Sequence, residues 1–431
     1  MRIAFYTLGC KVNQYESELL SGLFAREGFD LVSHDDEADV YVINSCTVTS
    51  TGDAKTRKIL HRFRREHPGA LIALTGCFPQ AFPELAAQLP EADVITGSRN
   101  RYALVGAVKR ALATGERIVE IAAHTRDEPF EEMKIDSFTE RTRAFVKIED
   151  GCERYCAYCI IPKARGFIRS KPLDALREEL TALAANGYSE AVLVGINLSS
   201  YGKDLNLRLV DAIETAASVE GIKRVRLGSL EPELLSDEDI ARMARIPKLC
   251  PQFHLALQSG CDETLRRMNR HYDTAEYLRI VGSLREQFPN CAITTDIMVG
   301  FPGETEEEFA ASLAFVRSVA FAKAHVFAYS VREGTRAAGM SGQVPEAVKA
   351  ERSRRMIAVT DETAAAFLKE QIGRTVPVLF ESRNGKNGLE GYASNYAQVV
   401  VPTGGGAPGE ICSVQIIDAA EHFCIGKIIS H

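Results

Sequence analysis

The sequence contains no run of about 20 consecutive apolar residues, which is the length that a membrane-spanning helix needs. Its first residues, MRIAFYTLGCKVNQYES, also lack the apolar core of a secretory signal peptide, because polar residues appear by position 10. We therefore expect no membrane association and a cytoplasmic location.

The sequence also lacks an excess of basic residues and the cysteine spacings of a disulfide framework. With 51 Lys and Arg against 58 Asp and Glu, the net charge is −7. This balance excludes a globally basic nucleic-acid-binding protein, although a local basic surface remains compatible with it. The 11 cysteines are an odd number, and several stand in short motifs. In a reducing cytoplasm this pattern favours metal or redox chemistry over disulfides.

Residues 1–110 alternate short apolar runs with stretches of helical spacing, a rhythm typical of a parallel sheet covered by helices. The predicted strands are IAFYTLG, VYVINS, LIALTG and DVITG, and Cys10, Cys46 and Cys77 each close one of them. Because the carboxyl ends of strands form the ligand crevice of open α/β sheets, these three thiols could converge at one edge. The alternative is that each is a small buried packing residue.

The remainder of the chain divides into three segments. Residues 111–140 form a connector that contains an acidic stretch. Residues 141–368 contain six further strand–helix units, which predict a partial (β/α)6 barrel with its active site at the carboxyl ends of the strands. Residues 369–431 show short strands and glycine turns, which predict a small β-barrel. The expected fold class is α/β, with an open parallel sheet, a partial barrel and a small β-barrel in that order.

The loop EDGCERYCAYC, after the first predicted barrel strand, holds Cys152, Cys156 and Cys159 with the spacing C-x3-C-x2-C. Closed zinc sites and ordinary iron–sulfur clusters take four ligands, and their usual motifs are spaced differently. Three thiolates can hold three irons of a cubane and leave the fourth iron open to a small molecule, which is the interpretation that we favour. The alternative is a zinc site completed by Cys250 or His254.

This loop resembles the signature of the radical S-adenosylmethionine (SAM) superfamily, in which Tyr158 would occupy the usual aromatic position. Nearly the whole chain resembles the methylthiotransferases of that superfamily. TLGCKVNQYES, NSCTVT and TGC are similar to their amino-terminal domain, and YCIIPKARGFIRSKP, LQSG, MNRHY, DIMVGFPGET and FAYSVREGT to their radical domain. The carboxyl-terminal segment is similar to their TRAM domain, a small β-barrel that usually binds RNA.

The resemblance implies an enzyme with two 4Fe-4S clusters and SAM as cofactors, and an electron-donor protein as a partner. The implied cluster ligands are Cys152, Cys156 and Cys159 for the radical cluster, and Cys10, Cys46 and Cys77 for a second cluster that handles sulfur. One SAM molecule would donate a methyl group, and a second would give the 5′-deoxyadenosyl radical that abstracts hydrogen from the substrate carbon. A methylthio group would then replace that hydrogen. No catalytic acid or base is predicted.

The resemblance also implies contacts to SAM at the strand ends of the barrel. The implied residues are Gly195 and Asn197 for the amino group, Ser229 and Glu231 for ribose or methionine atoms, and Asp296 and Gly300 around the adenine. Each of these residues has an alternative interpretation as a strand-end cap or a turn. Arg165 and Arg169 in KARGFIRS are candidates for binding phosphate or the SAM carboxylate, or for pairing with surface acids.

Members of the family modify an adenosine beside the tRNA anticodon or an aspartate of a ribosomal protein. KVNQYES after Cys10 resembles the branch that acts on N6-threonylcarbamoyladenosine, whereas the isopentenyladenosine branch tends to QMN and the protein-modifying branch to PKN. The expected substrate is therefore tRNA, and the expected product is 2-methylthio-N6-threonylcarbamoyladenosine. The alternatives are isopentenyladenosine in tRNA, a ribosomal-protein aspartate, or a non-catalytic metal-binding protein that binds RNA.

Two further features bear on RNA binding. AKTRKILHRFRREH places Lys55, Lys58, Arg62 and Arg65 on one helical stripe, which predicts contacts to phosphates or, alternatively, a solvated helix face. Tyr392 and Tyr396 either stack on bases or pack in a core. Residues 371–431 contain four Lys and Arg against five Asp and Glu, so this segment is less basic than expected and leaves the protein substrate open.

Overall fold

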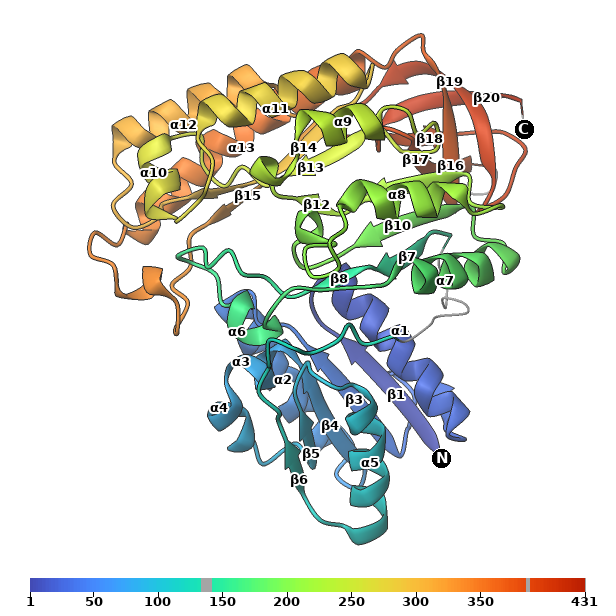
Figure 1. The fold of residues 1–431 in the computed structure, drawn as a ribbon, viewed down its shortest axis with the longest axis vertical. Helices are drawn as coiled ribbons and strands as arrows, with labels where there is room; N and C mark the ends of the chain where they lie inside the picture. Colours follow the sequence, from blue (N-terminus) through green and yellow to red (C-terminus); the bar gives the residue numbers. More distant parts are fainter. Residues whose placement is uncertain (133–141, 385–387, 431) are drawn as a thin grey trace.

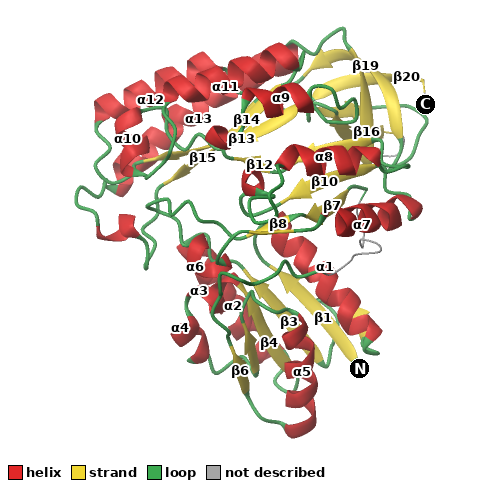
Figure 2. Ribbon diagram, in the orientation of Figure 1, coloured by secondary structure: helices red, strands yellow, loops and turns green. Residues whose placement is uncertain are grey.

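The computed structural model describes residues 1–132, 142–384 and 388–430, and Figure 1 shows three parts in contact. An amino-terminal sheet with its helices lies below a central open barrel, and a small β-barrel packs beside the central one. Helices and strands alternate through the first two parts, whereas the third consists mainly of strands (Figure 2). Within the described ranges, no helix is long and apolar enough to span a membrane.

The amino-terminal sheet has six parallel strands in the order β2-β1-β3-β4-β5-β6. Their bounds are β1 (Arg2–Thr7), β2 (Asp30–Val32), β3 (Val40–Ser45), β4 (Leu71–Gly76), β5 (Val94–Thr96) and β6 (Ile118–Glu120). One face packs on α1 (Lys11–Arg26) and α5 (Tyr102–Thr114), and the other on α2 (Ser50–Glu66), α3 (Cys77–Ala81) and α4 (Pro83–Ala87). Because side chains alternate along a strand, Val42 faces the first pair of helices and Ile43 the second group.

The four strands predicted for this part are present as β1, β3, β4 and β5. Two edge strands, β2 and β6, were not predicted, because each has only three residues and carries exposed or partly exposed side chains. β6 pairs with β5 from within the segment 111–140, which corrects the expectation of a connector for residues 118–120. Residues 133–140 of that segment lie outside the described residues.

The central part is the predicted partial barrel, with parallel strands that follow one another in chain order. Its two sheets are β11-β10-β7 and β12-β13-β14-β15, and only Gly228 separates β11 from β12. The strands are β7 (Ala144–Lys147), β10 (Glu190–Val194), β11 (Arg224–Leu227), β12 (Ser229–Leu230), β13 (Gln252–Leu255), β14 (Ala292–Val299) and β15 (Lys323–Ala328).

Helices between these strands cover the outside of the barrel and bury its apolar outer face. They are α7 (Leu173–Ala185), α8 (Leu209–Ser218), α9 (Asp237–Met243), α10 (Asp262–Arg267), α11 (Thr274–Gln287) and α12 (Glu306–Val319). A short hairpin, β8 (Glu149–Asp150) with β9 (Arg169–Ser170), and α6 (Ile161–Arg165) follow β7. Short 3-10 helices at Leu198–Ser200, Pro232–Leu234 and Arg336–Gly339 complete the strand-end loops.

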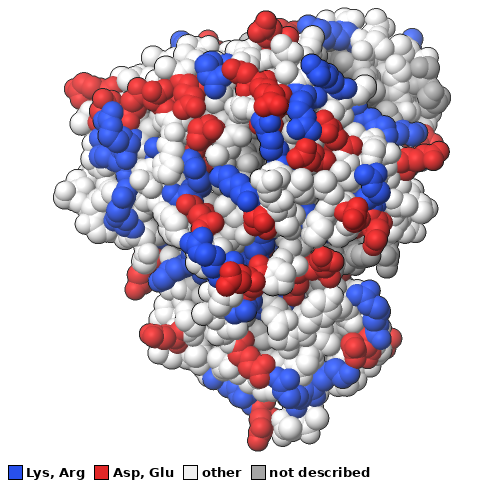
Figure 3. Space-filling view, in the orientation of Figure 1, with Lys and Arg blue, Asp and Glu red and all other residues white. Residues whose placement is uncertain are grey.

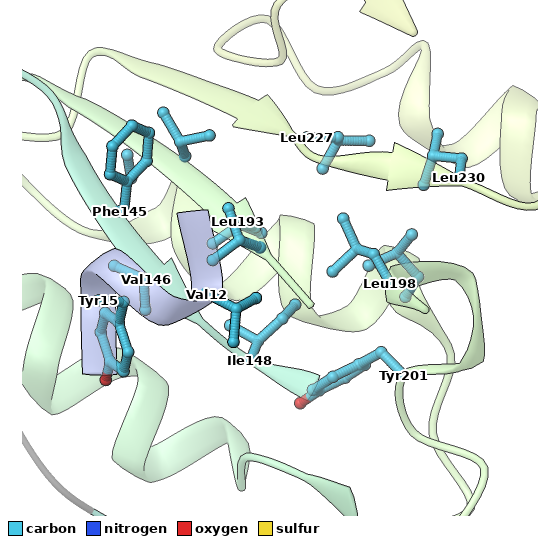
Figure 4. Close-up of a cluster of buried hydrophobic side chains, with 14 of the residues drawn as sticks. Val12, Tyr15, Phe145, Val146, Ile148, Leu193, Leu198, Tyr201, Leu227 and Leu230 are labelled. Carbon is cyan, nitrogen blue, oxygen red and sulfur yellow. The ribbon is translucent and has the colours of Figure 1, made fainter. Parts of the chain in front are cut away.

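The barrel is open beside β7, and α1 of the amino-terminal part packs there. Figure 4 shows Val12 and Tyr15 of α1 against Val146 and Ile148, in one buried apolar cluster. The first turn of α1 therefore closes part of the open side of the barrel, which brings the loop before it to the barrel interior.

The carboxyl-terminal part is a closed five-stranded barrel in the order β16-β17-β18-β20-β19, as predicted. The strands are β16 (Thr375–Asn384), β17 (Gly388–Ala393), β18 (Gln398–Val401), β19 (Ile411–Ala419) and β20 (Cys424–Ser430), and α13 (Glu346–Lys369) leads into them. Arg224 and Arg226 at the start of β11 donate to backbone carbonyls at the end of β17, each at 3.0 Å in its shortest bond. The small barrel is thus fixed at the amino ends of the central strands.

Candidate active site

The three amino-terminal thiols lie together at one edge of the first sheet. β1, β3 and β4 are adjacent parallel strands, and Cys10, Cys46 and Cys77 follow their carboxyl ends. Gly9 has φ +111°, and a Cβ atom there would lie 2.8 Å from the Cβ and 3.1 Å from the Sγ of Cys46. Glycine at this position therefore lets the loop that carries Cys10 pack directly on Cys46.

Asn13 and Arg165 contact the sulfur atoms of this group. The Oδ1 atom of Asn13 accepts from Cys10 Sγ at 3.6 Å and from Arg165 Nη2 at 2.7 Å. The Nε atom of Arg165 donates to Cys77 Sγ at 3.1 Å. Burial raises the pKa of the Cys77 thiol to about 12, although Arg165 opposes the shift. Metal binding displaces thiol protons, so these converging sulfurs, of which only Cys77 is buried, suit a metal cluster that supplies the compensating positive charge.

A buried network of charges lies behind the thiols, between the first two parts. The Glu16 carboxylate accepts from Arg165 Nη1 at 2.5 Å, from Lys147 Nζ at 2.8 Å and also from Arg101. Burial alone would raise the pKa of Glu16, but Arg101, Arg165 and Lys147 outweigh it and lower the pKa to about 2. Asp150, directly before the loop of Cys152, joins the network through Lys147 at 2.5 Å.

These contacts correct the interpretation of Arg165 and Arg169 as phosphate ligands or partners of surface acids. Both side chains are buried. Arg169 pairs with Glu128 at 3.0 Å and donates to the backbone carbonyl of Arg165 at 3.0 Å. The two arginines instead connect the amino-terminal thiols to the start of the barrel, because their acidic partners are interior residues.

The second group of thiols lies at the carboxyl end of β7, as predicted for Cys152, Cys156 and Cys159. The backbone N–H of Cys159 donates to the Cys156 carbonyl at 3.0 Å, so the last two thiols share one tight turn. Cys156 and Cys159 line a cavity of about 470 Å³. Burial raises the pKa of Cys152 to about 12 and also raises the pKa of Cys159. The set again offers three sulfurs that a cluster could bind.

The structure adds Arg270, from MNRHY, to this group. Its Nη1 atom donates to Cys156 Sγ at 3.2 Å, and its Nη2 atom donates to Glu231. Its Nη1 atom also lies 3.5 Å from the Tyr158 hydroxyl. Asn13 and Arg270 stand in motifs that the sequence shares with the family, but nothing in those motifs indicated contacts with sulfur.

The zinc alternative is not compatible with the position of Cys250. This residue lies two positions before β13, at the amino end of a parallel strand and therefore opposite the loop after β7. His254 is already engaged, because its Nδ1 atom lies 3.1 Å from Thr294 Oγ1 and its Nε2 atom 3.4 Å from Asp296 Oδ2. In the described part of the chain, no three His, Cys, Asp or Glu side chains, including those of the two thiol groups, lie close enough together to hold one metal ion.

Gly195 and Asn197 lie beside the loop of Cys152. Glu149 Oε2 accepts from the backbone N–H of Asn197 at 2.7 Å, and Asn197 Nδ2 lies 3.9 Å from Cys152 Sγ. A Cβ atom at Gly195 would lie 2.6 Å from Glu149 Oε2. Burial raises the pKa of Glu149 to about 8, so this carboxyl group holds a proton more strongly than an exposed glutamate.

The other residues expected around SAM do not form one group with Gly195 and Asn197. Ser229 is exposed on β12, and Glu231 faces Arg270. Asp296 points toward His254 inside the barrel. The N–H of Gly300 donates to Glu304 at 2.9 Å, and a Cβ atom there would lie 2.4 Å from Lys349 Cγ. Gly300, with φ +71°, therefore has a structural reason to be glycine whether or not it borders a ligand.

The two features expected to bind RNA have mixed surroundings. Tyr392 and Tyr396 stack on each other, with centroids 4.6 Å apart, and the Arg143 guanidinium lies 5.3 Å from each ring. On α2, Lys55, Lys58 and Arg65 are exposed, whereas Arg62 and Arg64 pack partly inward. On the face drawn in Figure 3, acidic and basic side chains are interspersed, so no single-sign area dominates it.

Three family models match consecutive parts of the chain. The Radical SAM superfamily matches residues 146–316, Uncharacterized protein family UPF0004 matches residues 2–97, and the TRAM domain matches residues 369–429. Among solved structures, the radical SAM methyltransferase TsrM from Kitasatospora setae has a TM-score of 0.60 at 12% identity, covering 78% of this chain and 74% of that one. At this identity the likeness concerns the fold alone.

Curated relatives align over nearly the whole chain. The threonylcarbamoyladenosine tRNA methylthiotransferase MtaB of Bacillus subtilis is 36% identical, over 99% of this chain and 96% of its own. The protein of the same name from Thermotoga maritima is 38% identical, over 97% and 95%. The tRNA-2-methylthio-N(6)-dimethylallyladenosine synthase of Caldicellulosiruptor saccharolyticus is 35% identical, over 98% and 91%. With its three parts and both groups of thiols, this chain belongs to the radical SAM methylthiotransferases that act on tRNA.

Proposed function

We propose that this protein adds a methylthio group to carbon 2 of N6-threonylcarbamoyladenosine beside the tRNA anticodon, giving 2-methylthio-N6-threonylcarbamoyladenosine. The observation that carries a two-cluster reaction is the proximity of the two groups of thiols. Cys77 packs in one apolar cluster with Ile160, the residue after Cys159, and α3 lies against α6. Sulfur held at the first group and a radical formed at the second would therefore act on one substrate between them.

The proposed cofactors are two 4Fe-4S clusters and SAM, held by the residues that surround each sulfur group. When bound, they supply sulfur, a methyl group and the radical that removes the substrate hydrogen. The chain itself positions the ligands. Arg270 orients Cys156 through an N–H···S bond and is in turn held by Glu231. Arg165 does the same for Cys77, and Asn13 Oδ1 accepts from the Cys10 thiol. A cytoplasmic location and an electron-donor protein belong to the same proposal.

The choice of threonylcarbamoyladenosine is supported by two observations. KVNQYES after Cys10 resembles the branch with this substrate. The relatives from Bacillus subtilis and Thermotoga maritima carry the corresponding name, although the dimethylallyladenosine synthases are nearly as similar. Isopentenyladenosine, another name for the dimethylallyl base, is therefore the second candidate.

Mass spectrometry of tRNA nucleosides from a strain that lacks the gene tests this choice. We expect 2-methylthio-N6-threonylcarbamoyladenosine to disappear and its unmethylthiolated precursor to accumulate. The wild-type gene should restore the product, whereas a Cys152→Ala gene should not. Selective loss of the 2-methylthio form of isopentenyladenosine would assign the enzyme to the other branch.

A further inference from the structure

Lys11, the first residue of α1, lies where the three parts of the molecule meet. Its Nζ atom is 5.8 Å from the centre of the Phe145 ring, on β7 of the barrel. Tyr396 of the small barrel and His325 of β15 are both near enough to interact with its charge. Because Lys11 directly follows Cys10, its ammonium group extends from the edge of the amino-terminal thiols into the barrel interior.

The surroundings of Lys11 carry more positive than negative charge. Arg143, Arg224 and Arg226 share two carboxylates, since Arg143 pairs with Glu381 at 2.5 Å and the other two pair with Glu190 at 2.8 Å. Lys11 has no carboxylate within ion-pair distance among the residues that the structure describes. Lys323 and Asp296 lie beside His254 and His325. They add one positive and one negative charge, so the excess of positive charge is unchanged.

The pKa of Tyr396 agrees with this excess of positive charge. Burial would raise the pKa of its hydroxyl group, yet Arg143, Lys11 and Arg226 outweigh burial and lower the pKa below its usual value. Only surroundings that favour a negative charge lower the pKa of a phenol below its usual value.

Lys11 is also open to solvent, because its side chain is exposed although it lies where the three parts meet. The side chains of β15 that face the same space, Lys323, His325 and Phe327, are exposed as well. Lys323, Thr294 and Tyr396 line a neighbouring cavity of about 220 Å³, whose lining also includes Asp361 and Glu421 but not Lys11. An accessible ammonium group without a carboxylate partner, in surroundings that favour anions, is suited to bind an anionic ligand.

We propose that Lys11 binds a carboxylate on the substrate base, which is the threonyl carboxylate if the substrate proposed above is correct. The threonylcarbamoyl group ends in a carboxylate, whereas the dimethylallyl group is a hydrocarbon. A base with the hydrocarbon would leave the ammonium group partly desolvated and unpaired, which disfavours its binding. Because Lys11 directly follows Cys10, the bound group would lie within the reach of one lysine side chain from the thiols proposed to supply sulfur. Lys11 is thus a specificity-determining residue.

The test compares RNA binding by the enzyme with both clusters assembled. Three anticodon stem-loops of one sequence would carry threonylcarbamoyladenosine, isopentenyladenosine or adenosine at the target position. Lys11→Met should weaken binding of the first RNA by about tenfold or more, the loss of one charge-assisted contact, and leave the others within about twofold. Lys11→Arg should retain most of the preference, and Lys11→Gln provides a second neutral variant if the methionine variant does not fold.

Four outcomes separate the possible errors. Equal weakening of all three RNAs would show that Lys11 contacts a phosphate, and unchanged binding would show that it contacts no anion; either result overturns the proposal. If wild-type enzyme binds and converts the isopentenyladenosine RNA in preference to the threonylcarbamoyladenosine RNA, the substrate proposal itself fails. If wild-type enzyme prefers threonylcarbamoyladenosine and Lys11→Met keeps that preference, only the role of Lys11 is wrong.

Discussion

Arg165 is fully buried and joins the two halves of the site through a single side chain. It donates to Cys77 Sγ at 3.1 Å, to Asn13 Oδ1 at 2.7 Å and to Glu16 Oε1 at 2.5 Å. It lies on α6, close in sequence to Cys159. Hydrogen bonds to the sulfur ligands of a cluster stabilise its more negative, reduced form, so they raise the reduction potential.

We therefore expect Arg165→Gln to lower the midpoint potential of the amino-terminal cluster and to destabilise the fold. Removing one partner of a buried ion pair costs about 3–5 kcal/mol, because Glu16 would keep fewer cations around it. Redox titration followed by electron paramagnetic resonance measures the potential, and thermal unfolding measures the stability. Arg165→Lys should restore part of the stability but not the potential, since the Nε donor is lost.

A matched control is Arg110→Gln, which breaks an exposed ion pair with Glu120 on α5 and β6. Such surface pairs contribute about 1 kcal/mol or less. A midpoint potential that is equal in Arg165→Gln and wild type would show that the contact with Cys77 is only a packing contact.

At the scale of single elements, the basic side chains of α2 differ in their exposure to solvent. Phe63 is buried against the sheet, and the Arg62 guanidinium lies 4.9 Å from its ring. Arg64 donates to the Glu91 carbonyl at 2.9 Å and pairs with Asp93 at 2.5 Å. Lys55 and Lys58 remain exposed and have no ion-pair partner in the described ranges. Arg65 is exposed as well but pairs with Glu66, so Arg62 is the member of the predicted stripe that packs inward.

Reversing both lysines, in Lys55→Glu/Lys58→Glu, should weaken binding of tRNA whatever base it carries. If each lysine contacts one phosphate, the slope of log K against log salt concentration should fall by about 1.5. Lys223→Glu/Arg245→Glu makes the same change in net charge at exposed positions of the central barrel and serves as the control. An equal effect of both double variants would show only the influence of overall charge.

At the scale of the whole molecule, the two groups of thiols lie in different parts with separate supports. Cys46 follows a strand of the amino-terminal sheet, whereas Cys152 follows β7 of the barrel. Loss of one group should therefore leave the other assembled. In Cys46→Ala, iron should fall by about half, from two clusters of four irons to one, while SAM cleavage persists and methylthiolated product disappears.

Cys152→Ala should also lose about half of the iron, but it should lose SAM cleavage together with the product. Iron analysis, 5′-deoxyadenosine and modified nucleoside are measured on the same preparations. Cys291→Ala, in the barrel but away from both groups, should match wild type in all three. Full iron content and normal product in Cys46→Ala would show that the amino-terminal thiols are packing residues.

Local patterns in the sequence determined most of the fold. Apolar runs bounded by turn residues predicted β1, β3, β4 and the barrel strands. A strand of a parallel sheet that is covered on both faces needs apolar side chains at nearly every position, so each such strand can be recognised from its own residues. The same patterns placed the six cysteines at strand ends, and the motifs around them indicated the family. The short edge strands β2 and β6 were not predicted, because three residues with exposed or partly exposed side chains show too little hydrophobic periodicity.

Only the tertiary structure decided which side chains meet across the three parts. Arg165 contacts Cys77, 88 positions away, and Lys11 extends toward His325 and Tyr396. Tyr392 and Tyr396 stack on each other beside Arg143, which the sequence left undecided between RNA bases and a core. Such contacts depend on how α1 enters the open side of the barrel and how the small barrel packs on β11. No periodicity within one segment encodes that arrangement, because its energy comes from surfaces that are distant along the chain.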